Sequence, residues 1–410
     1  MQYRSTLEVR DFVVSCAIRA RQRARAIGAL GTSGVLPLLA LGLVAPRPAH
    51  AIPYWARKYN VTCSQCHVSV PRLNAFGFGF LARGYAMPPD GTFASRRTVP
   101  LAIWIGGRSD SRPAGATTAD HVRAYLNRVE IISGGRVVAP WLSYFAEWRP
   151  VSQESRSNGT LRDRGGRFED LFLTASGRNL AVTVGQFRQI DQVDPSRRLS
   201  ISEPLVLSSS LAGSGGGTAR ERSLRAFAPG ARSPSVRVAW NQRVRGAWTW
   251  TTSAALPIPG ELSIPLTDEA RKEASNEIEF RPKGVFAESY MRSGSTSLGA
   301  HVFYDDGRRY LADAVATGRV ASLYWTGIGG LAKSGQPLTG RWSLEGEFIP
   351  SRFAGLGGRV EDRAGDRTDV AFVPYLNLSL PATKYTIRLQ VERRIQKGRN
   401  ATLFEFSTVF

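Results

Sequence analysis

The chain has 410 residues, a formal net charge of +21 and a pI near 10.7. This length allows two or three ordinary domains or one large β structure. The positive charge suits nucleic acid, an anionic membrane surface or an acidic protein partner, but the lack of a compact basic block argues against nucleic acid. The sequence shows no phosphate-binding loop, nucleophile elbow or credible carboxylate pair, so nothing in it indicates hydrolytic chemistry.

Residues 1–51 are predicted to form a secretory signal peptide. A basic flank with four arginines precedes a mostly apolar run from 26 to 45, and Ala49-His50-Ala51 has the A-x-A pattern of a cleavage site. A retained transmembrane anchor is the alternative, but glycine and proline interrupt the apolar run. The mature chain is therefore expected to begin near Ile52 and to be exported.

Residues 63–67 read Cys-Ser-Gln-Cys-His, which is the attachment signature of a c-type haem. In such a motif the thiols of Cys63 and Cys66 add to the haem vinyl groups, and His67 ligates the iron. A disulfide, or a zinc site that would need a fourth ligand, is the alternative in an exported protein. The other cysteine, Cys16, lies in the expected signal peptide. We therefore expect one covalently attached haem c.

Residues 52–97 are predicted to be a small α-helical monohaem cytochrome segment. Apolar residues recur at helical spacing between Leu73 and Leu81, and Gly84 is expected to end that helix. So short a segment cannot bury a haem in a core of its own. We therefore expect the rest of the chain to cover the haem.

The iron ligand opposite His67 is the open question of this segment. Met87 follows His67 by 20 residues and stands beside a Pro-Pro turn, which makes it the first candidate; packing against the ring is the alternative. His121, water or another group are further candidates.

Aromatic residues near the motif are expected to wall the haem and exclude water, which would raise its reduction potential. These residues are Tyr54, Trp55, Phe76, Phe78 and Phe80. Arg57 and Lys58 are candidates to meet the haem propionates, with ordinary surface charges as the alternative.

From about Val99 the apolar residues follow period two. Lys384–Glu392 alternates without a fault, with Tyr, Ile, Leu and Val on one face and polar residues on the other. Such runs predict antiparallel strands. Fourteen runs are found, at 101–107, 125–137, 141–148, 170–176, 180–186, 236–241, 247–254, 285–292, 298–304, 320–329, 341–348, 370–380, 384–392 and 402–410.

Two details favour an outer-membrane barrel over a soluble β-sandwich. The polar strand faces carry many charges, and aromatic residues such as Trp141 and Trp342 stand near strand ends, as in barrels with a wet lumen and interfacial girdles. Short connections such as Gly177–Asn179 alternate with long ones such as Ile190–Ser235. Because even strand numbers are the rule for bacterial barrels, residues 98–410 are predicted to form a transmembrane porin-like barrel of sixteen strands, with fourteen as the alternative.

The residues around the haem motif resemble a known family. The pattern is Ala51-x-Pro53-x-x-Ala56-Arg57, then Cys63-x-x-Cys66-His67, then Pro71-x-Leu73-Asn74-Ala75-Phe76-Gly77-x-x-Phe80-x-x-x-Gly84-Tyr85. It resembles the fused monohaem cytochrome–porin family, best known for iron-oxidising outer-membrane cytochromes. The detailed match covers about 35 residues. Beyond them the likeness is one of organisation, including an aromatic last strand like the assembly signal of outer-membrane barrels.

The resemblance implies a location in the bacterial outer membrane and a haem segment that plugs or caps the lumen. It also implies that electrons pass from extracellular ferrous iron to a periplasmic c-type cytochrome or other carrier, with Fe(II) oxidase activity as a consequence. This sequence departs from the iron-oxidiser pattern at Trp55, at 58–60 and at 68–70. Another electron donor therefore stays open.

Two other functions compete with the electron conduit. One is a solute porin with a structural or regulatory haem segment, whose inward arginines such as Arg388 and Arg394 would favour anions. The other is a periplasmic haem sensor with a soluble β domain. By strand parity His301 is expected to point into the lumen and Met291 towards lipid. If the chain is a conduit, residues 52–95 are expected to lie inside the barrel, because the hydrocarbon layer alone is about 30 Å thick.

Overall fold

The computed structural model describes residues 53–87, 99–111, 123–137, 139–155, 161–193, 197–208, 230–258, 260–273, 282, 284–305, 309–333, 338–362, 370–381, 385–396 and 400–410. They belong to a compact unit that spans Pro48–Phe410. The expected signal peptide, the Pro-Pro turn and His121 lie outside the described residues. Within the described ranges no helix is both long and apolar enough to cross a bilayer.

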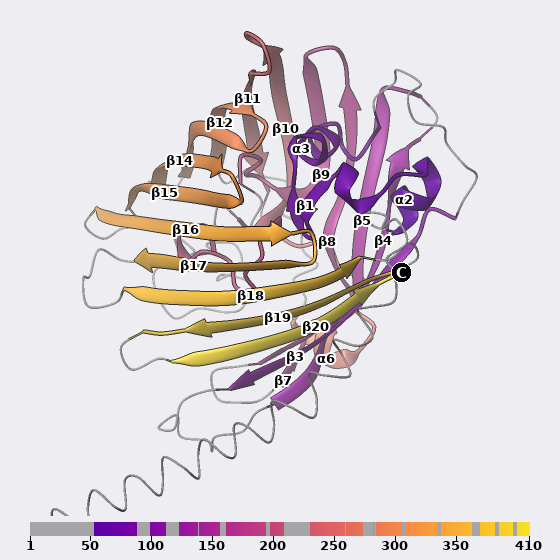
Figure 1. The fold of residues 1–410 in the computed structure, drawn as a ribbon. Helices are drawn as coiled ribbons and strands as arrows, with labels where there is room; N and C mark the ends of the chain where they lie inside the picture. Colours follow the sequence, from indigo (N-terminus) through magenta and orange to yellow (C-terminus); the bar gives the residue numbers. More distant parts are fainter. Residues whose placement is uncertain are drawn as a thin grey trace, which may run out of the picture. The chain divides into compact units, whose positions relative to one another are not determined.

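In the described part of the chain, sixteen antiparallel strands pair into one closed barrel (Figure 1). Each barrel strand pairs with the next one along the chain, and β20 closes the sheet against β3, with Val409 opposite Trp104. The predicted sixteen-stranded barrel is confirmed, and the alternative of fourteen strands is wrong. The strands are β3 (Ala102–Ser111), β4 (Arg123–Arg136), β5 (Leu142–Val151), β8 (Arg167–Ser176), β9 (Leu180–Arg188), β10 (Arg232–Arg243), β11 (Thr249–Pro257), β12 (Gly284–Ser293), β13 (Thr296–Asp305), β14 (Tyr310–Val320), β15 (Leu323–Lys333), β16 (Thr339–Ser351), β17 (Ala354–Asp362), β18 (Ala371–Pro381), β19 (Thr386–Arg394) and β20 (Ala401–Val409).

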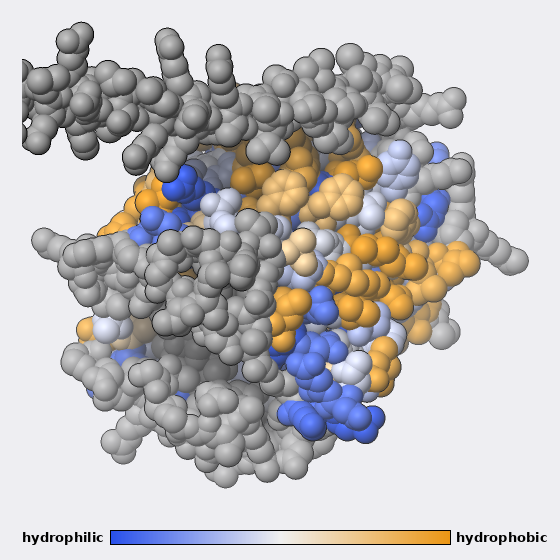
Figure 2. All heavy atoms as spheres, turned by 90° about the horizontal axis from the view of Figure 1, so that it is seen from below, coloured by the Kyte–Doolittle hydropathy of each residue, from blue (hydrophilic) through white to orange (hydrophobic). Residues whose placement is uncertain are grey.

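Alternate side chains of the barrel strands point to opposite faces of the wall. In β16 the inward Glu345 is 1% exposed, whereas its outward neighbour Leu344 is 56% exposed. The same alternation runs through β18 and β19, because successive strand residues face opposite sides. Figure 2 shows apolar side chains gathered over a broad area of the surface, next to a smaller charged area. A polar interior inside an apolar outer belt is the architecture of bacterial outer-membrane porins.

Two barrel strands, β14 and β17, were not predicted from the sequence pattern. In β14 the outward positions include Ala312, Ala314 and Ala316, so the contrast between the two faces is weak. In β17 glycine occupies several positions and leaves few side chains to alternate. The predicted run 320–329 also joined the end of β14 to β15, whereas Ala321, at φ 51°, turns the chain between them.

Short and long connections lie at opposite ends of the barrel, because successive antiparallel strands turn at alternate ends. At one end, two residues each join β12 to β13, β14 to β15, and β16 to β17. At the other end run the connections 152–166, 189–231 and 258–283. The predicted alternation of connection lengths is confirmed. We call the first end the short-turn end.

Two of the long connections carry small elements of their own. The hairpin of β6 (Gln153–Ser155) and β7 (Leu161–Asp163) lies in the connection after β5. Helix α6 (Asp268–Glu273) lies in the connection after β11, and Thr267 Oγ1 accepts a hydrogen bond of 3.0 Å from the Ala270 N–H. This side chain satisfies a helix N–H that has no partner within the helix.

The connection between β9 and β10 folds back into the lumen. We call residues 189–193 and 197–208, which include α4 (Leu205–Ser208), the inner strap. Backbone N–H groups of the strap donate to inward carboxylates of β12, β16, β17 and β19. The pairs are Asp191 and Gln192 to Glu288, Leu199 to Glu347, Ile201 and Ser202 to Glu392, and Leu205 to Glu361, at 2.8–3.0 Å. Charged partners make such bonds worth about 1.5–3 kcal/mol each, so the strap is held along its length.

Apolar packing holds the strap from the other side. Its buried apolar side chains pack against inward apolar residues of β11 to β15. This cluster contains Ile190, Val193, Val206, Leu207, Ala255, Phe286, Phe303, Leu311, Val315, Ile328 and Ala332. The strap therefore occupies part of the lumen rather than the outer surface, which the sequence pattern did not indicate.

Candidate haem site

Residues 53–87, which we call the plug, lie against the inner wall at the short-turn end. The plug contains α2 (Pro53–Tyr59), a 3₁₀ turn (Cys63–Gln65), β1 (His67–Ser69), β2 (Arg72–Leu73) and α3 (Ala75–Ala82). The predicted helix is confirmed, although Leu73 precedes it. The Asn74 side chain caps α3 by accepting a hydrogen bond of 2.9 Å from the Gly77 N–H. Figure 1 places α2, α3 and β1 within the ring of strands.

Hydrogen bonds join the plug to two separate strands of the wall. On one side Arg136 Nη2 of β4 donates to the Met87 carbonyl oxygen at 2.6 Å. On the other side Ser379 Oγ and Asn377 Nδ2 of β18 donate to the Val70 carbonyl oxygen at 3.1 and 3.3 Å. The plug is thus tied to two wall strands that are separated by β19, β20 and β3 in the barrel order.

The haem motif is folded tightly inside the plug. Cys63 and Cys66 are buried free thiols: Cys63 begins the 3₁₀ turn and Cys66 follows it, and the Cys66 N–H donates to the Cys63 carbonyl oxygen at 3.1 Å. Burial raises the pKa of both thiols to about 12. Helix α3 packs directly on the motif, because a Cβ on Gly77 would lie 2.2 Å from the Cys66 carbonyl oxygen.

The two ring nitrogens of His67 have different surroundings. Its Nδ1 lies 3.1 Å from the carbonyl oxygen of Pro71, which can accept a hydrogen bond only if Nδ1 carries the proton. This tautomer leaves the Nε2 lone pair for a metal, and such a bond on the other nitrogen orients ligating histidines. Burial, followed by the nearby Arg197 charge, lowers the pKa of His67 to about 4. The ring is therefore neutral at neutral pH, which is the ligating form.

An apolar pocket opens beside His67. It is partly open to solvent. Its lining comprises Trp55, Val61, Cys66, His67, Leu73, Gly77, Phe80, Leu81, Tyr85, Met87 and Arg197. Met87 and His67 thus share one pocket. Trp55 Nε1 is buried and has no hydrogen-bond partner among the described residues. An apolar wall, an imidazole, a thioether and an unused N–H donor together fit a haem.

Aromatic rings continue from the pocket into the barrel wall. Trp55 stacks on Tyr85 with centroids 5.2 Å apart, Tyr85 stacks on Phe145 of β5 at 4.0 Å, and Phe145 meets Phe172 of β8 at 5.6 Å. Phe80 meets Trp55 edge-on at 5.2 Å. Sequence reasoning missed Tyr85 and Phe145 as site residues; the Gly84-Tyr85 pair was the available signal for the first.

The predicted haem walls divide into three groups. Trp55 and Phe80 line the pocket. Tyr54 and Phe76 belong to the same apolar cluster without lining the pocket. Phe78 lines a neighbouring chamber instead, and the guanidinium carbon of Arg292 lies 3.8 Å from the centroid of its ring.

The other predicted residues have clear positions. Arg57 donates to the Leu101 carbonyl at 3.2 Å and Lys58 to Tyr54 at 3.1 Å, and neither lines the pocket. His301 points into the lumen as predicted and lies 2.9 Å from Asp313.

The remaining orientation predictions are also confirmed. Arg388 is buried on the lumen side, and Arg394 lies 3.3 Å from the inward carboxylate of Glu361. Met291 is exposed on the outer face.

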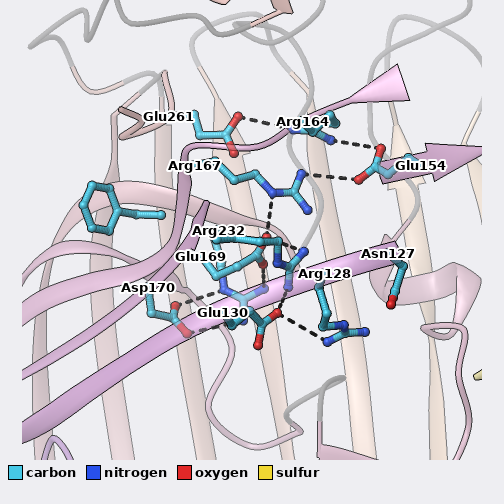
Figure 3. A network of polar contacts seen from close by, with 12 residues as sticks. Asn127, Arg128, Glu130, Glu154, Arg164, Arg167, Glu169, Asp170, Arg232 and Glu261 are labelled. Atoms are coloured by element: carbon cyan, nitrogen blue, oxygen red, sulfur yellow. Dashed lines mark hydrogen bonds and ion pairs between the residues drawn. The ribbon is translucent and has the colours of Figure 1, made fainter. Parts of the chain in front are cut away.

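The lumen wall itself is strongly ionic. Glu169 holds guanidinium groups from three strands: Arg149 and Arg167 at 2.8 Å, and Arg232 at 2.6 Å. Figure 3 shows this carboxylate at the centre of the network, with Asp170 also paired to Arg232. Such networks keep the interior polar while the outer face is apolar.

Comparisons with known proteins find likeness in structure only. No protein-family model matches the sequence, and no curated protein matches it. One similar structure is the high-pH structure of OprB from Pseudomonas putida, which is 10% identical in sequence. The match covers 76% of this chain and 94% of the OprB chain, with a TM-score of 0.47. A second is OmpF of Salmonella typhi in complex with daunomycin, which is 8% identical. The match covers 76% of this chain and 97% of the OmpF chain, also with a TM-score of 0.47. A third is OmpT of Vibrio cholerae, which is 9% identical. The match covers 77% of this chain and 99% of the OmpT chain, with a TM-score of 0.41.

Proposed function

We propose that this protein carries single electrons across the outer membrane. One haem c, attached to Cys63 and Cys66 and ligated by His67, would accept electrons from an extracellular donor and deliver them to a periplasmic c-type cytochrome or another carrier. The observation that carries the proposal is the His67 ring, hydrogen-bonded through Nδ1 and lining an apolar pocket shared with Cys66 and Met87. When bound there, the haem would supply a one-electron redox centre.

The residues of the pocket have distinct roles in this proposal. The Pro71 carbonyl orients His67, so that Nε2 is available to the iron. Met87 is the candidate for the opposite ligand, and Arg136 holds its backbone in place. The unused Trp55 Nε1–H is a donor for a polar group of the cofactor.

The aromatic rings around the pocket exclude water. Trp55, Phe80, Tyr85 and Phe145 are all buried and in mutual contact. Exclusion of water disfavours the charged ferric state and raises the reduction potential. A haem that accepts electrons from a weak reductant such as ferrous iron requires a high reduction potential.

The barrel supports a location in the outer membrane. Its strands have 9 to 14 residues, enough to cross a bilayer when tilted, and their outward faces are apolar. In outer-membrane barrels the short turns face the periplasm. The plug at the short-turn end would therefore stand close to a periplasmic acceptor.

This position also restricts the donor. The hydrocarbon layer is about 30 Å thick, so a donor that stays outside the cell would be too far from the plug. The donor must enter the lumen and pass the inner strap. A small soluble ion such as ferrous iron meets this requirement, whereas a protein or a mineral surface does not.

A solute porin with a structural or regulatory haem segment is the second candidate. The ionic wall around Glu169 favours it, because such walls line water-filled channels. The plug and the inner strap both occupy the lumen, which argues for a narrow channel if one exists.

Two measurements decide between the candidates. Haem staining on a denaturing gel should label the wild type and fail with the double variant Cys63→Ala, Cys66→Ala, while Met291→Ala on the outer face should stain normally. Stopped-flow mixing of the oxidised holoprotein with ferrous iron should then show haem reduction. A stained protein that neither ferrous iron nor other small reductants reduce, but that conducts ions in planar bilayers, would favour the porin.

A further inference from the structure

A second chamber adjoins the haem pocket and is lined by arginines. It is partly open to solvent and shares Leu73 and Arg197 with the haem pocket. Four arginines line it: Arg72, Arg197, Arg198 and Arg292. They come from three different parts of the chain, namely β2 of the plug, the inner strap and β12.

The carboxylates near the chamber are already engaged. Arg72 Nη1 lies 2.6 Å from Glu347 Oε2, and the other oxygen of Glu347 accepts the strap N–H of Leu199 at 3.0 Å. Glu345 contacts Arg198 and accepts the Tyr375 hydroxyl at 2.6 Å. Arg72 and Arg198 thus contact carboxylates, whereas Arg292 Nη2 donates to the Gln192 carbonyl oxygen at 2.6 Å and Arg197 Nη2 to the Tyr85 hydroxyl at 3.3 Å.

Arg198 has unused donors inside the protein. Its residue is only 2% exposed, and its Nε and Nη1 have no hydrogen-bond partner among the described residues. Leaving a buried donor without a partner is unfavourable, and more so when the donor is charged. An anion in the chamber would remove this cost.

We propose that the chamber binds carboxylate groups. Arginine matches a carboxylate with two parallel N–H···O bonds, and arginines from separate elements can hold two carboxylates at once. The aromatic face of Phe78, fixed under Arg292, forms an apolar wall for the carbon chain that carries them. The carboxylates belong either to the haem propionates, which rests on the proposed function, or to a free polycarboxylate in the lumen.

The propionate source follows from the position of the chamber. Arg197 lines both spaces, so groups attached to a haem edge would enter the chamber directly. Arg57 and Lys58, which the sequence suggested for this role, are engaged elsewhere. Positive charge beside the haem stabilises its less positive ferrous state, so loss of an arginine should lower the reduction potential.

The test compares Arg198→Gln and Arg292→Gln with Arg319→Gln. Arg319 is an exposed arginine at the same mouth that does not line the chamber. Two variants on different elements are used because either substitution alone could disturb folding. Heat-modified migration on gels verifies the barrel in each.

Two measurements on the holoprotein separate the sources. For propionates, a redox titration of each chamber variant should show at least a tenfold shift towards the oxidised form, which is 59 mV for one electron. For a free polycarboxylate, calorimetric titration with citrate should show at least tenfold weaker binding in the chamber variants. Arg319→Gln should change neither value. Unchanged potential and unchanged citrate binding in both folded chamber variants would overturn the proposal.

Failure of the proposed function is distinguishable from failure of this inference. A barrel that carries no haem cannot be titrated for its potential, but citrate binding and its loss in Arg198→Gln can still be measured. Absent haem together with absent citrate binding would overturn the chamber as a carboxylate site as well.

Discussion

His67 Nδ1 lies 3.1 Å from the carbonyl oxygen of Pro71, four residues along the same chain. A backbone acceptor cannot be lost by changing a side chain, so it sets the tautomer of His67 through the local fold. The ring is therefore oriented before any cofactor is present. Because it is already ordered, cofactor binding does not lose the conformational entropy of ordering it.

Met87 is expected to be the ligand opposite His67. In Met87→Ala the thioether bonds to Cys63 and Cys66 should keep the haem attached, while the iron loses a sixth ligand. Absorption spectra should change from low-spin to high-spin character, and the reduction potential should fall. Met291→Ala, on the outer face of the barrel, is the matched control. An unchanged spectrum in Met87→Ala would show that the residue only packs against the ring.

Gly77→Ala is expected to disrupt the haem motif. The new Cβ would lie 2.2 Å from the Cys66 carbonyl oxygen, and overpacking of this kind costs about 1–3 kcal/mol. Gly79→Ala is the control in the same helix, since its Cβ would meet only the flexible end of Arg83, at 3.3 Å. Alanine in a helix is otherwise favoured by about 0.5–1 kcal/mol. Denaturant midpoints of the haem absorbance should fall for Gly77→Ala alone; equal midpoints would contradict the close contact.

Gly84→Ala is expected to loosen the plug from the wall. Gly84 has φ +62°, and a Cβ there would lie 2.5 Å from Ser143 Oγ and 2.7 Å from Thr174. Gly294 has a similar φ of +58°, but a Cβ there would meet nothing within 4 Å. Gly294→Ala therefore introduces the backbone strain without the steric clash. Proteolysis of the plug should quicken in Gly84→Ala and not in Gly294→Ala. If both variants behave alike, backbone strain and not docking is what matters.

Glu392→Gln is expected to free part of the inner strap. Its carboxylate accepts the N–H groups of Ile201 and Ser202 at 2.8 and 2.9 Å, and bonds to charged groups are worth about 1.5–3 kcal/mol each. Single-channel conductance in planar bilayers should rise as the strap leaves the lumen. Glu269→Gln removes the same charge from the exposed helix α6 and should leave conductance unchanged. Identical conductance in the two variants would show that the strap does not restrict the channel.

The barrel was predictable because its signal is local. A strand with one wet and one apolar face must alternate, and β19 does so at every position from Thr386 to Glu392. The two missed strands show the limit of that signal. Alanine on the outer face of β14 and glycine in β17 satisfy the same geometry with little difference in polarity.

The surroundings of the haem motif were not predictable in the same way. Phe145, Arg197 and Arg292 reach the plug from elements that begin 55 or more residues after its end. Nothing in the local pattern of the β9–β10 connection indicates that it enters the lumen. Its place depends on backbone N–H groups meeting Glu288, Glu347, Glu361 and Glu392 on four separate strands.

By itself the sequence determined the haem motif, the helix after it and the alternating strands, because each depends on residues within a few positions of one another. Only the tertiary structure decided that the plug lies in the short-turn mouth, that Met87 shares a pocket with His67, and that four arginines gather beside it. Those relationships depend on closure of the barrel, since closure brings β12 and β16 towards β4 and β5 across the lumen.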